Sequence, residues 1–313
     1  MKTLKTYFFI PLFIVTTALI FLLLYKYGHG FPGINPTPRQ LTVSDRTTES
    51  ELTPNMVYVK GGTFRMGGLT GKSRSALPVR EININNFIIS RYEITFVQFD
   101  RFCEALNILL PPDGGYGRGS RPVGNVNWYD AVRYCNWLSQ YESLDPCYQF
   151  FPDQRDKGNM SIFDTEKLLV IYDPSKNGYR LPSEAEWEFA AAGGVYSRSY
   201  IYSGSNKVDE VAWYFDNGGK YPNRVGEKLP NELGLYDMSG NVFEWTSGRY
   251  MKNYKDIQDG DTNPVGPDTG SSKVVRGGSC FFDRWGCKIC YRKALQPASR
   301  VPYVGFRVVR SVL

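Results

Sequence analysis

Residues 274–292 read Val274-Val-Arg-Gly-Gly-Ser-Cys-Phe-Phe-Asp-Arg-Trp-Gly-Cys-Lys-Ile-Cys-Tyr-Arg292, and residues 305–310 read Gly305-Phe-Arg-Val-Val-Arg310. The β-branched pair at the start of the first run and the apolar alternation in the second each indicate a strand. Between them lies an irregular stretch, residues 280–303, with three of the six cysteines and several aromatic and cationic side chains. Long irregular stretches held between strands tend to carry binding or catalytic groups. We therefore expect this stretch, called the central segment below, to carry the function.

The composition indicates a loop-rich α+β domain. The chain has 313 residues, including 22 Tyr, 19 Phe, 31 Gly and 19 Pro. That length allows one large or two medium domains, and no clean break and no fixed-period repeat follows residue 56. The net charge of +6 comes from scattered basic residues that form no block. Nucleic acid is therefore not expected as a partner.

The chain has one histidine, His29, which precedes the folded part. Nucleophilic systems of the Ser-His-Asp or Cys-His type need an imidazole base within the domain. Catalytic zinc sites usually need two or three histidine ligands. Both classes are close to excluded, so any catalysis is expected to use cysteine, carboxylate, tyrosine, lysine or a thiolate-bound metal.

The N-terminal residues 1–26 are predicted to form a membrane anchor. An uncharged apolar run, residues 7–25, is long enough for a hydrocarbon core of about 30 Å, although a cleaved signal peptide stays the alternative. Lys2 and Lys5 precede it and favour a single-pass topology with the domain outside the cytoplasm, either periplasmic or at the cell surface. Residues 27–55 are rich in Pro, Gly, Thr and Ser and are predicted to be a flexible linker.

The folded domain is predicted over residues 56–313. Strand-like runs are expected at 56–60, 62–67 and 82–89. Three helices are expected to begin after capping residues, at Thr95, Asn127 and Ser183. Residues 140–178 read as an excursion with a few short strands.

Residues 231–245 combine turn formers, carboxylates and apolar aromatics. A curled backbone would bring the carboxylates of Asp237 and Glu244 to one point. Carbonyls of the intervening turn would then complete an all-oxygen shell, which is the type that calcium prefers.

With these stretches in view, the chain resembles the formylglycine-generating enzyme (sulfatase-modifying factor) family over residues 56–313. The resemblance implies a C-type-lectin-like α+β fold with little regular secondary structure. The matching phrases are Val57-Tyr-Val-Lys-Gly-Gly-Thr-Phe-Arg-Met-Gly67, Tyr92-Glu-Ile-Thr95, Val126-Asn-Trp-Tyr-Asp-Ala-Val132, Tyr179-Arg-Leu-Pro-Ser-Glu-Ala-Glu-Trp-Glu-Phe-Ala190, Asn231–Trp245, Arg276-Gly-Gly-Ser279 and Gly305-Phe-Arg307.

The family carries calcium beside its Gly-Asn-x-x-Glu-Trp motif, which implies a site here. Carried over residue by residue, the side-chain ligands are Asp237 and Glu244, and the carbonyl ligands are Gly240 and Val242.

The active enzymes of the family bind copper(I) through two cysteines, three and eight residues beyond the Gly-Gly-Ser motif. They convert a cysteine of a sulfatase's Cys-X-Pro-X-Arg motif to formylglycine. The first position is Phe282 here, whereas the second is Cys287. Cys280 and Cys290 are the two conceivable substitutes for the missing thiol. A two-residue displacement on an extended strand moves a side chain by about 6–7 Å, so neither reproduces the family's spacing. Outside the cytoplasm the six cysteines also allow up to three disulfides.

We therefore predict a binding or scaffolding domain that lacks a complete catalytic pair. The predicted surface for a protein or surface ligand is aromatic and cationic, as interaction hot spots often are. Two alternatives stay open: a copper-dependent formylglycine-generating oxidase, and a ligand-binding protein of this fold diversified by a retroelement. The surface consists of Phe281, Phe282, Arg284, Trp285, Lys288, Arg292 and Tyr303.

Overall fold

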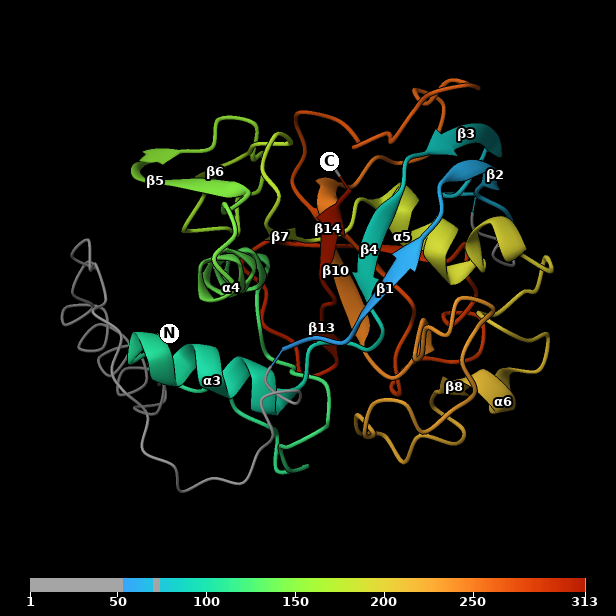
Figure 1. Ribbon diagram of the computed structural model, residues 1–313, viewed down its shortest axis with the longest axis horizontal. Coiled ribbons are helices and arrows are strands. Elements are labelled where there is room, and N and C mark those ends of the chain that lie inside the picture. The colour runs from blue at the N-terminus through green and yellow to red at the C-terminus, as the bar shows by residue number, and fades with distance from the viewer. Residues whose placement is uncertain (1–52, 70–73, 313) are drawn as a thin grey trace, which may run out of the picture. The chain divides into compact units, whose positions relative to one another are not determined.

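The chain's last strand lies at the middle of its first sheet. The structure is a computed structural model that describes residues 53–69 and 74–312. Strand β14 pairs antiparallel with both of its neighbours, β4 and β7, and β4 pairs in turn with β1 (Figure 1). The N-terminal and C-terminal ends of the described domain are thereby joined. The strands of this sheet are β1 (Met56–Val59), β4 (Phe87–Ser90), β14 (Val309–Ser311) and β7 (Tyr179–Arg180).

The second sheet closes the base of the central segment. Arg276 at the end of β11 is opposite Arg292 at the start of β12, so residues 277–291 leave and re-enter the sheet at neighbouring points. The later strand β13 pairs parallel to β10, with Glu244 opposite Gly305. In sheet order the strands are β12 (Arg292–Leu295), β11 (Lys273–Arg276), β10 (Phe243–Arg249) and β13 (Val304–Gly305).

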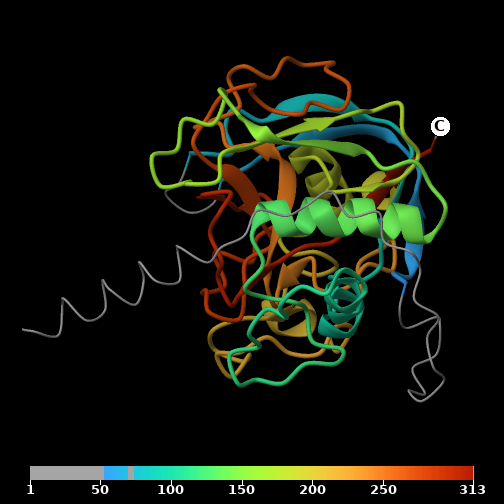
Figure 2. The ribbon, with the colours of Figure 1, turned by 90° about the vertical axis from the view of Figure 1, so that its left-hand side faces the viewer.

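The longer helices begin at the capping residues that the sequence indicates. Thr95, Asn127 and Ser183 each accept a bond from the backbone three residues on, and each third residue bonds back. In both views α4 lies between α3 and the β5–β6 hairpin (Figures 1 and 2). The helices are α3 (Phe96–Leu106), α4 (Trp128–Tyr141), α5 (Glu184–Ala191), the 3-10 turn η1 (Gly194–Tyr196) and α6 (Val208–Val211).

Short two-stranded ribbons complete the described part of the chain. Residues 140–178 contain one of them, the β5–β6 hairpin, as expected of that excursion. The ribbons are β2 (Gly62–Met66) with β3 (Arg80–Ile84), β5 (Tyr148–Arg155) with β6 (Leu168–Tyr172), and β8 (Ala212–Trp213) with β9 (Ser239–Gly240).

Two apolar clusters form the core. One packs α3 and α4 against β10 and β13, and the other packs α5 against β1 to β4. Trp245 is fully buried and donates from Nε1 to the carbonyl of Val126 at 3.0 Å, which ties β10 to the start of α4. Burial of such large aromatic side chains stabilises a fold with short strands and long loops.

The expected mixture of helices and sheets is confirmed. Within residues 53–69 and 74–312, no helix is both long and apolar enough to cross a bilayer. The predicted anchor at 1–26 and most of the predicted linker lie outside the described residues.

Candidate functional site

A tight reversal of the backbone comes just before the central segment. Gly277 and Gly278 follow β11 with φ of 95° and 82°, in the left-handed region that favours glycine. A Cβ on Gly278 would lie 2.6 Å from the carbonyl oxygen of Gly286. The segment therefore folds back against the glycine turn that precedes it, and only glycine at position 278 allows that close approach.

Arg276, the residue before the two glycines, holds the backbone of residues 289–291 in place. Its guanidinium is fully buried, and it donates to the carbonyls of Ile289 and Tyr291 at 3.0 Å each. It also pairs with Glu188 and Glu184 on α5. The backbone of the segment is thus anchored to the core through an ion pair that is inaccessible to solvent.

The aromatic residues of the segment divide into packed and exposed groups. Phe282 lies against Phe243, with ring centroids 4.8 Å apart, and its ring is covered by Lys293 Nζ at 4.3 Å. Phe281 packs on Tyr303 at 5.0 Å. Trp285 is 51% exposed and carries Lys288 Nζ over its ring at 4.3 Å.

One predicted surface residue is wrongly placed. Arg292 is buried, and it donates to both oxygens of Glu184 at 2.7 and 2.6 Å. It holds β12 to α5 instead of facing a partner. Of the other predicted surface positions, Arg284 and Trp285 are exposed, whereas Phe281, Phe282, Lys288 and Tyr303 are half-buried.

The three thiols of the segment form no disulfide, and burial raises their pKa values. Cys280, Cys287 and Cys290 are free, as are the three cysteines elsewhere in the described chain, so the disulfides considered from the sequence are absent there. Burial raises the pKa of Cys287 to about 12 and that of Cys290 to about 11, and it also raises the pKa of Cys280. Burial thus disfavours the thiolate form that a nucleophile needs, whereas a bound metal ion would itself deprotonate a coordinating thiol.

The two thiols of the Cys287-x-x-Cys290 run contact different parts of the chain. Cys287 Sγ lies 3.7 Å from the carbonyl of Asp283, within its own turn, whereas Cys290 Sγ lies 3.9 Å from the carbonyl of Leu69. In the described part of the chain, no group of three or more His, Cys, Asp or Glu side chains is arranged to hold a metal ion.

A buried acidic cluster lies under the second sheet. Glu244 accepts from Arg307 at 2.7 and 2.8 Å and from Trp187 Nε1 at 2.7 Å. Glu93 accepts from the Asn241 amide and from the backbone of Val242. Sequence reasoning overlooked Glu93, because it lies 148 residues from Asn241 and only the Tyr92-Glu-Ile-Thr95 phrase marked it.

The third carboxylate, Asp237, has only one oxygen that accepts a hydrogen bond from the described residues. Oδ2 accepts from the backbone of Gly226 at 2.7 Å, but Oδ1 is buried and has no hydrogen-bond partner among the described residues. Burial raises the pKa of Asp237 to about 6, and burial together with the charges of Asp237 and Glu244 raises the pKa of Glu93. Asp237, Gly240 and Asn241 have left-handed backbone, which curls this turn.

Asp237, Glu244 and the backbone carbonyls of this turn are oxygen donors of the kind that calcium prefers, although the three carboxylates of the cluster are not by themselves arranged as a metal site. The cluster holds the three carboxylates of Glu93, Asp237 and Glu244 against the single guanidinium of Arg307, which leaves two negative charges in excess when all are ionised. Each Glu244 oxygen keeps acceptor capacity beside its bonds to Arg307 and Trp187, since a carboxylate has about four lone-pair sites. The unpartnered Asp237 Oδ1 is the atom that most needs a positive neighbour.

Comparison with known proteins agrees with this geometry. A model of the sulfatase-modifying factor enzyme 1-like domain matches residues 42–312. The chain belongs to this family. The match begins at residue 42, inside the stretch predicted as a linker.

Relatives in the sulfatase-modifying factor family carry different names. The chaperone protein LppX of Paenibacillus barcinonensis is 34% identical over 287 residues, covering 86% of this chain and 93% of that protein. The formylglycine-generating enzyme of Thermomonospora curvata is 26% identical over 299 residues, covering 84% and 95%.

Solved structures of similar fold include Treponema denticola variable protein 1 and CarF. The first has a TM-score of 0.66 at 31% identity and covers 82% of this chain and 94% of its own. CarF has a TM-score of 0.61 at 28% identity and covers 84% and 100%. The expected formylglycine-generating-enzyme-like fold is therefore confirmed.

Proposed function

We propose that this sulfatase-modifying-factor domain binds another protein through the exposed part of its central segment and does not oxidise cysteine. The observation that carries the proposal is Phe282, which stands where the active enzymes have their first copper cysteine. Its ring packs between Phe243 and Lys293, so the position contributes to an aromatic surface instead of a metal site.

The remaining thiols support the same conclusion. Cys287 is fully buried and its pKa is raised, and Phe282 stands at the position of the cysteine that pairs with it in the active enzymes. A relative named as a chaperone, at higher identity than the Thermomonospora curvata enzyme, favours a protein as the bound species.

Oxidase activity is the second candidate, because a formylglycine-generating enzyme matches along 95% of its own length. We expect no aldehyde when the purified chain is incubated with copper(I), oxygen, a thiol reductant and a Cys-X-Pro-X-Arg peptide. Mass spectrometry of the peptide makes the measurement, with the Thermomonospora curvata enzyme as the positive control. Aldehyde formation by the native chain would refute the proposal.

A variant that restores the missing cysteine tests directly whether position 282 decides copper(I) binding. Phe282→Cys is expected to bind copper(I) together with Cys287, whereas the native chain and the neighbouring variant Phe281→Cys are not. Thiolate pairs are the ligands that this soft ion prefers. Equal copper binding by the native chain would show that Cys280 or Cys290 already completes a site.

The exposed part of the segment is expected to contain the binding hot spot. Replacing Arg284 and Trp285 together by alanine should weaken partner binding at least tenfold, since exposed Trp and Arg contribute most at interfaces, often about 2 kcal/mol or more. A photo-crosslinker at Phe281 identifies the partner, and titration then compares the variants. Leu109→Ala, which changes a leucine that is 96% exposed elsewhere on the domain, is the control. Unchanged binding by the double variant would place the interface elsewhere.

We further propose that calcium occupies the acidic cluster, held by Asp237 and Glu244 with the carbonyls of Gly240 and Val242. Bound calcium would neutralise the excess charge and fix this turn beneath the second sheet. At a hundredfold excess over Kd it is expected to stabilise the fold by about 2.7 kcal/mol. Urea unfolding in calcium and in chelator measures this, and Asp237→Asn should abolish the difference while the exposed Asp283→Asn should not. Identical unfolding in both buffers would argue against the site.

We also propose that residues 1–26 anchor the domain in a membrane, with the domain outside the cytoplasm. The support is the uncharged run at 7–25 with its preceding lysines. Protease added to intact cells should digest the domain. Protection until the membrane is broken would contradict this topology.

A further inference from the structure

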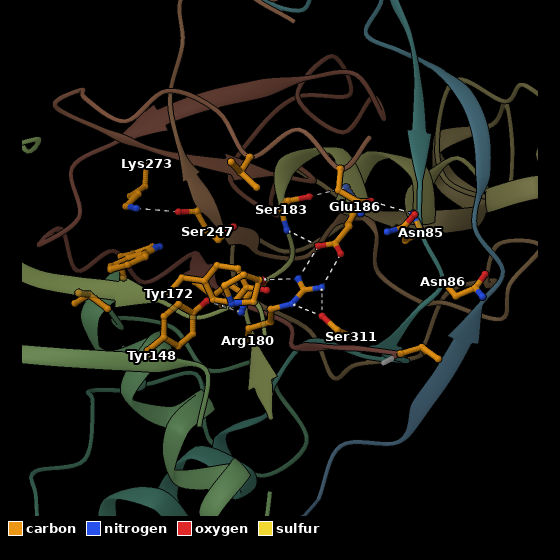
Figure 3. A pocket seen from close by; sticks show the side chains of 17 residues that line it. Asn85, Asn86, Tyr148, Tyr172, Arg180, Ser183, Glu186, Ser247, Lys273 and Ser311 are labelled. Atoms are coloured by element: carbon orange, nitrogen blue, oxygen red, sulfur yellow. Dashed lines mark hydrogen bonds and ion pairs between the residues drawn. The ribbon is translucent and has the colours of Figure 1, made fainter. Parts of the chain in front are cut away.

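A large cavity lies apart from the central segment. It has a volume of about 550 Å³ and includes no residue of 280–303 in its wall. The wall is formed by the β5–β6 hairpin, the start of α4, strand β7, the N-terminal end of α5, strands β10 and β11 and the end of β14. Cavities of this size commonly enclose small organic ligands. The residues that line the cavity include Trp128, Tyr148, Tyr172, Arg180, Glu186 and Lys273 (Figure 3).

Arg180 and Glu186 neutralise each other at the floor of the cavity. The guanidinium donates to both oxygens of Glu186 at 2.7 Å each, and its Nε donates to Ser311 Oγ at 3.2 Å. Both side chains are buried. This pair therefore leaves little net charge for a ligand to satisfy.

Lys273 is the second cationic side chain of the cavity wall, and its surroundings differ from those of Arg180. Its residue is 9% exposed, its Nζ donates to the Ser247 carbonyl at 2.8 Å, and Nζ lies 3.9 Å from the centre of the Trp128 ring. Figure 3 places Lys273 and Ser247 on the side of the cavity away from Asn85 and Asn86. No carboxylate of the described residues forms an ion pair with it, although an ammonium has three donors.

Asp156, the acidic group whose charge attracts Lys273, is already paired. It forms an ion pair with Arg249, and both residues border a second cavity of about 30 Å³ whose wall also includes Lys273. Arg249 repels the Lys273 ammonium and Asp156 attracts it, but burial dominates and lowers the pKa of Lys273 to about 7. Among the described residues, Lys273 thus has a carbonyl and an aromatic ring beside its amine, and it lacks the carboxylate of an ordinary buried ion pair.

We propose that the cavity binds a small monocarboxylic acid with an aromatic or aliphatic body, whose carboxylate pairs with Lys273. A single cationic donor matches one negative charge, whereas phosphates are usually held by several donors or an arginine fork. The rings of Trp128, Tyr148 and Tyr172 would cover the apolar body, with Val170, Leu181 and Val265 beside them. The site is separate from the proposed protein-binding surface and does not depend on it.

The test compares acids with their uncharged amides on the full chain. The probes are 4-phenylbutyrate and octanoate, each beside its primary amide, and binding is measured by isothermal titration at pH 7. At least one acid is expected to bind at least tenfold more tightly than its amide. Lys273→Met should bind that acid and its amide equally, and Lys252→Met, which changes an exposed lysine, should keep the native preference.

Each outcome decides the proposal. Equal binding of acid and amide by the native chain overturns it, as does the absence of binding by all four probes at millimolar concentration. Retention of the acid preference in Lys273→Met also overturns it. Lys273→Gln, which keeps a hydrogen-bond donor but no charge, gives the same comparison if the methionine variant does not fold.

Discussion

Arg307→Met is expected to lower the free energy of unfolding by about 3–5 kcal/mol, the usual cost of removing one partner from a buried ion pair. Arg307 is fully buried and donates to both oxygens of Glu244 and to the carbonyls of Ser90 and Tyr236. Methionine would leave these acceptors without a donor. It would also remove the positive charge that attracts the carboxylates of Glu93, Asp237 and Glu244.

Urea unfolding followed by tryptophan fluorescence measures this loss. Arg300→Met is the matched control, because Arg300 pairs with Asp130 at the surface and its side chain is 50% exposed. Exposed pairs contribute about 0–1 kcal/mol. The double variant Glu244→Gln with Arg307→Met should recover part of the loss, since it removes the buried charge along with its partner. A single variant within 1 kcal/mol of the native chain would refute the assigned role.

Lys273→Met is expected to stabilise the protein, and the gain should disappear as the pH rises. Burial lowers the pKa of Lys273 from 10.5 to about 7. Below about pH 7 both folded and unfolded chains carry the proton, so the folded chain bears the full cost of a buried charge. Between pH 7 and 10.5 only the unfolded chain binds the proton, so native stability increases with pH, by at most about 1.4 kcal/mol per pH unit.

The increase in the free energy of unfolding caused by Lys273→Met should therefore be largest below pH 7, at no more than about 4–5 kcal/mol. It should be absent above pH 10.5. Urea unfolding of both chains at pH 6, 8 and 10 measures the slope. The exposed Lys252→Met should give no such slope. A stability difference that stays constant across this range would show that Lys273 remains protonated in the folded chain.

Local chemistry made part of the fold predictable. The three helix starts at Thr95, Asn127 and Ser183 follow from bonds that span three residues, and such bonds are visible in the sequence. The loop position of the central segment was equally visible, since strand-like runs and glycines mark both of its ends. The family phrases then gave the wider architecture.

Long-range pairing was not predictable in the same way. Arg292 read as part of a basic, aromatic surface, but its partner Glu184 lies 108 residues earlier. Glu93 and Asn241 are 148 residues apart, and the wall of the cavity around Lys273 draws its residues from many separate parts of the chain. The absence of disulfides in the described chain also depends on where the thiols pack, and cysteine spacing does not determine that.

Arg276 donates hydrogen bonds to the backbone of the central segment, and this has an evolutionary consequence. The carbonyls that it binds, at Ile289 and Tyr291, are present whatever the side chains there. The glycine reversal likewise depends on backbone geometry. Mutation at the exposed positions Arg284 and Trp285 would therefore change the proposed binding surface without changing the backbone that carries it. Selection can explore new partners at these positions at little cost to folding, as long as the buried arginine and the two glycines are inherited unchanged.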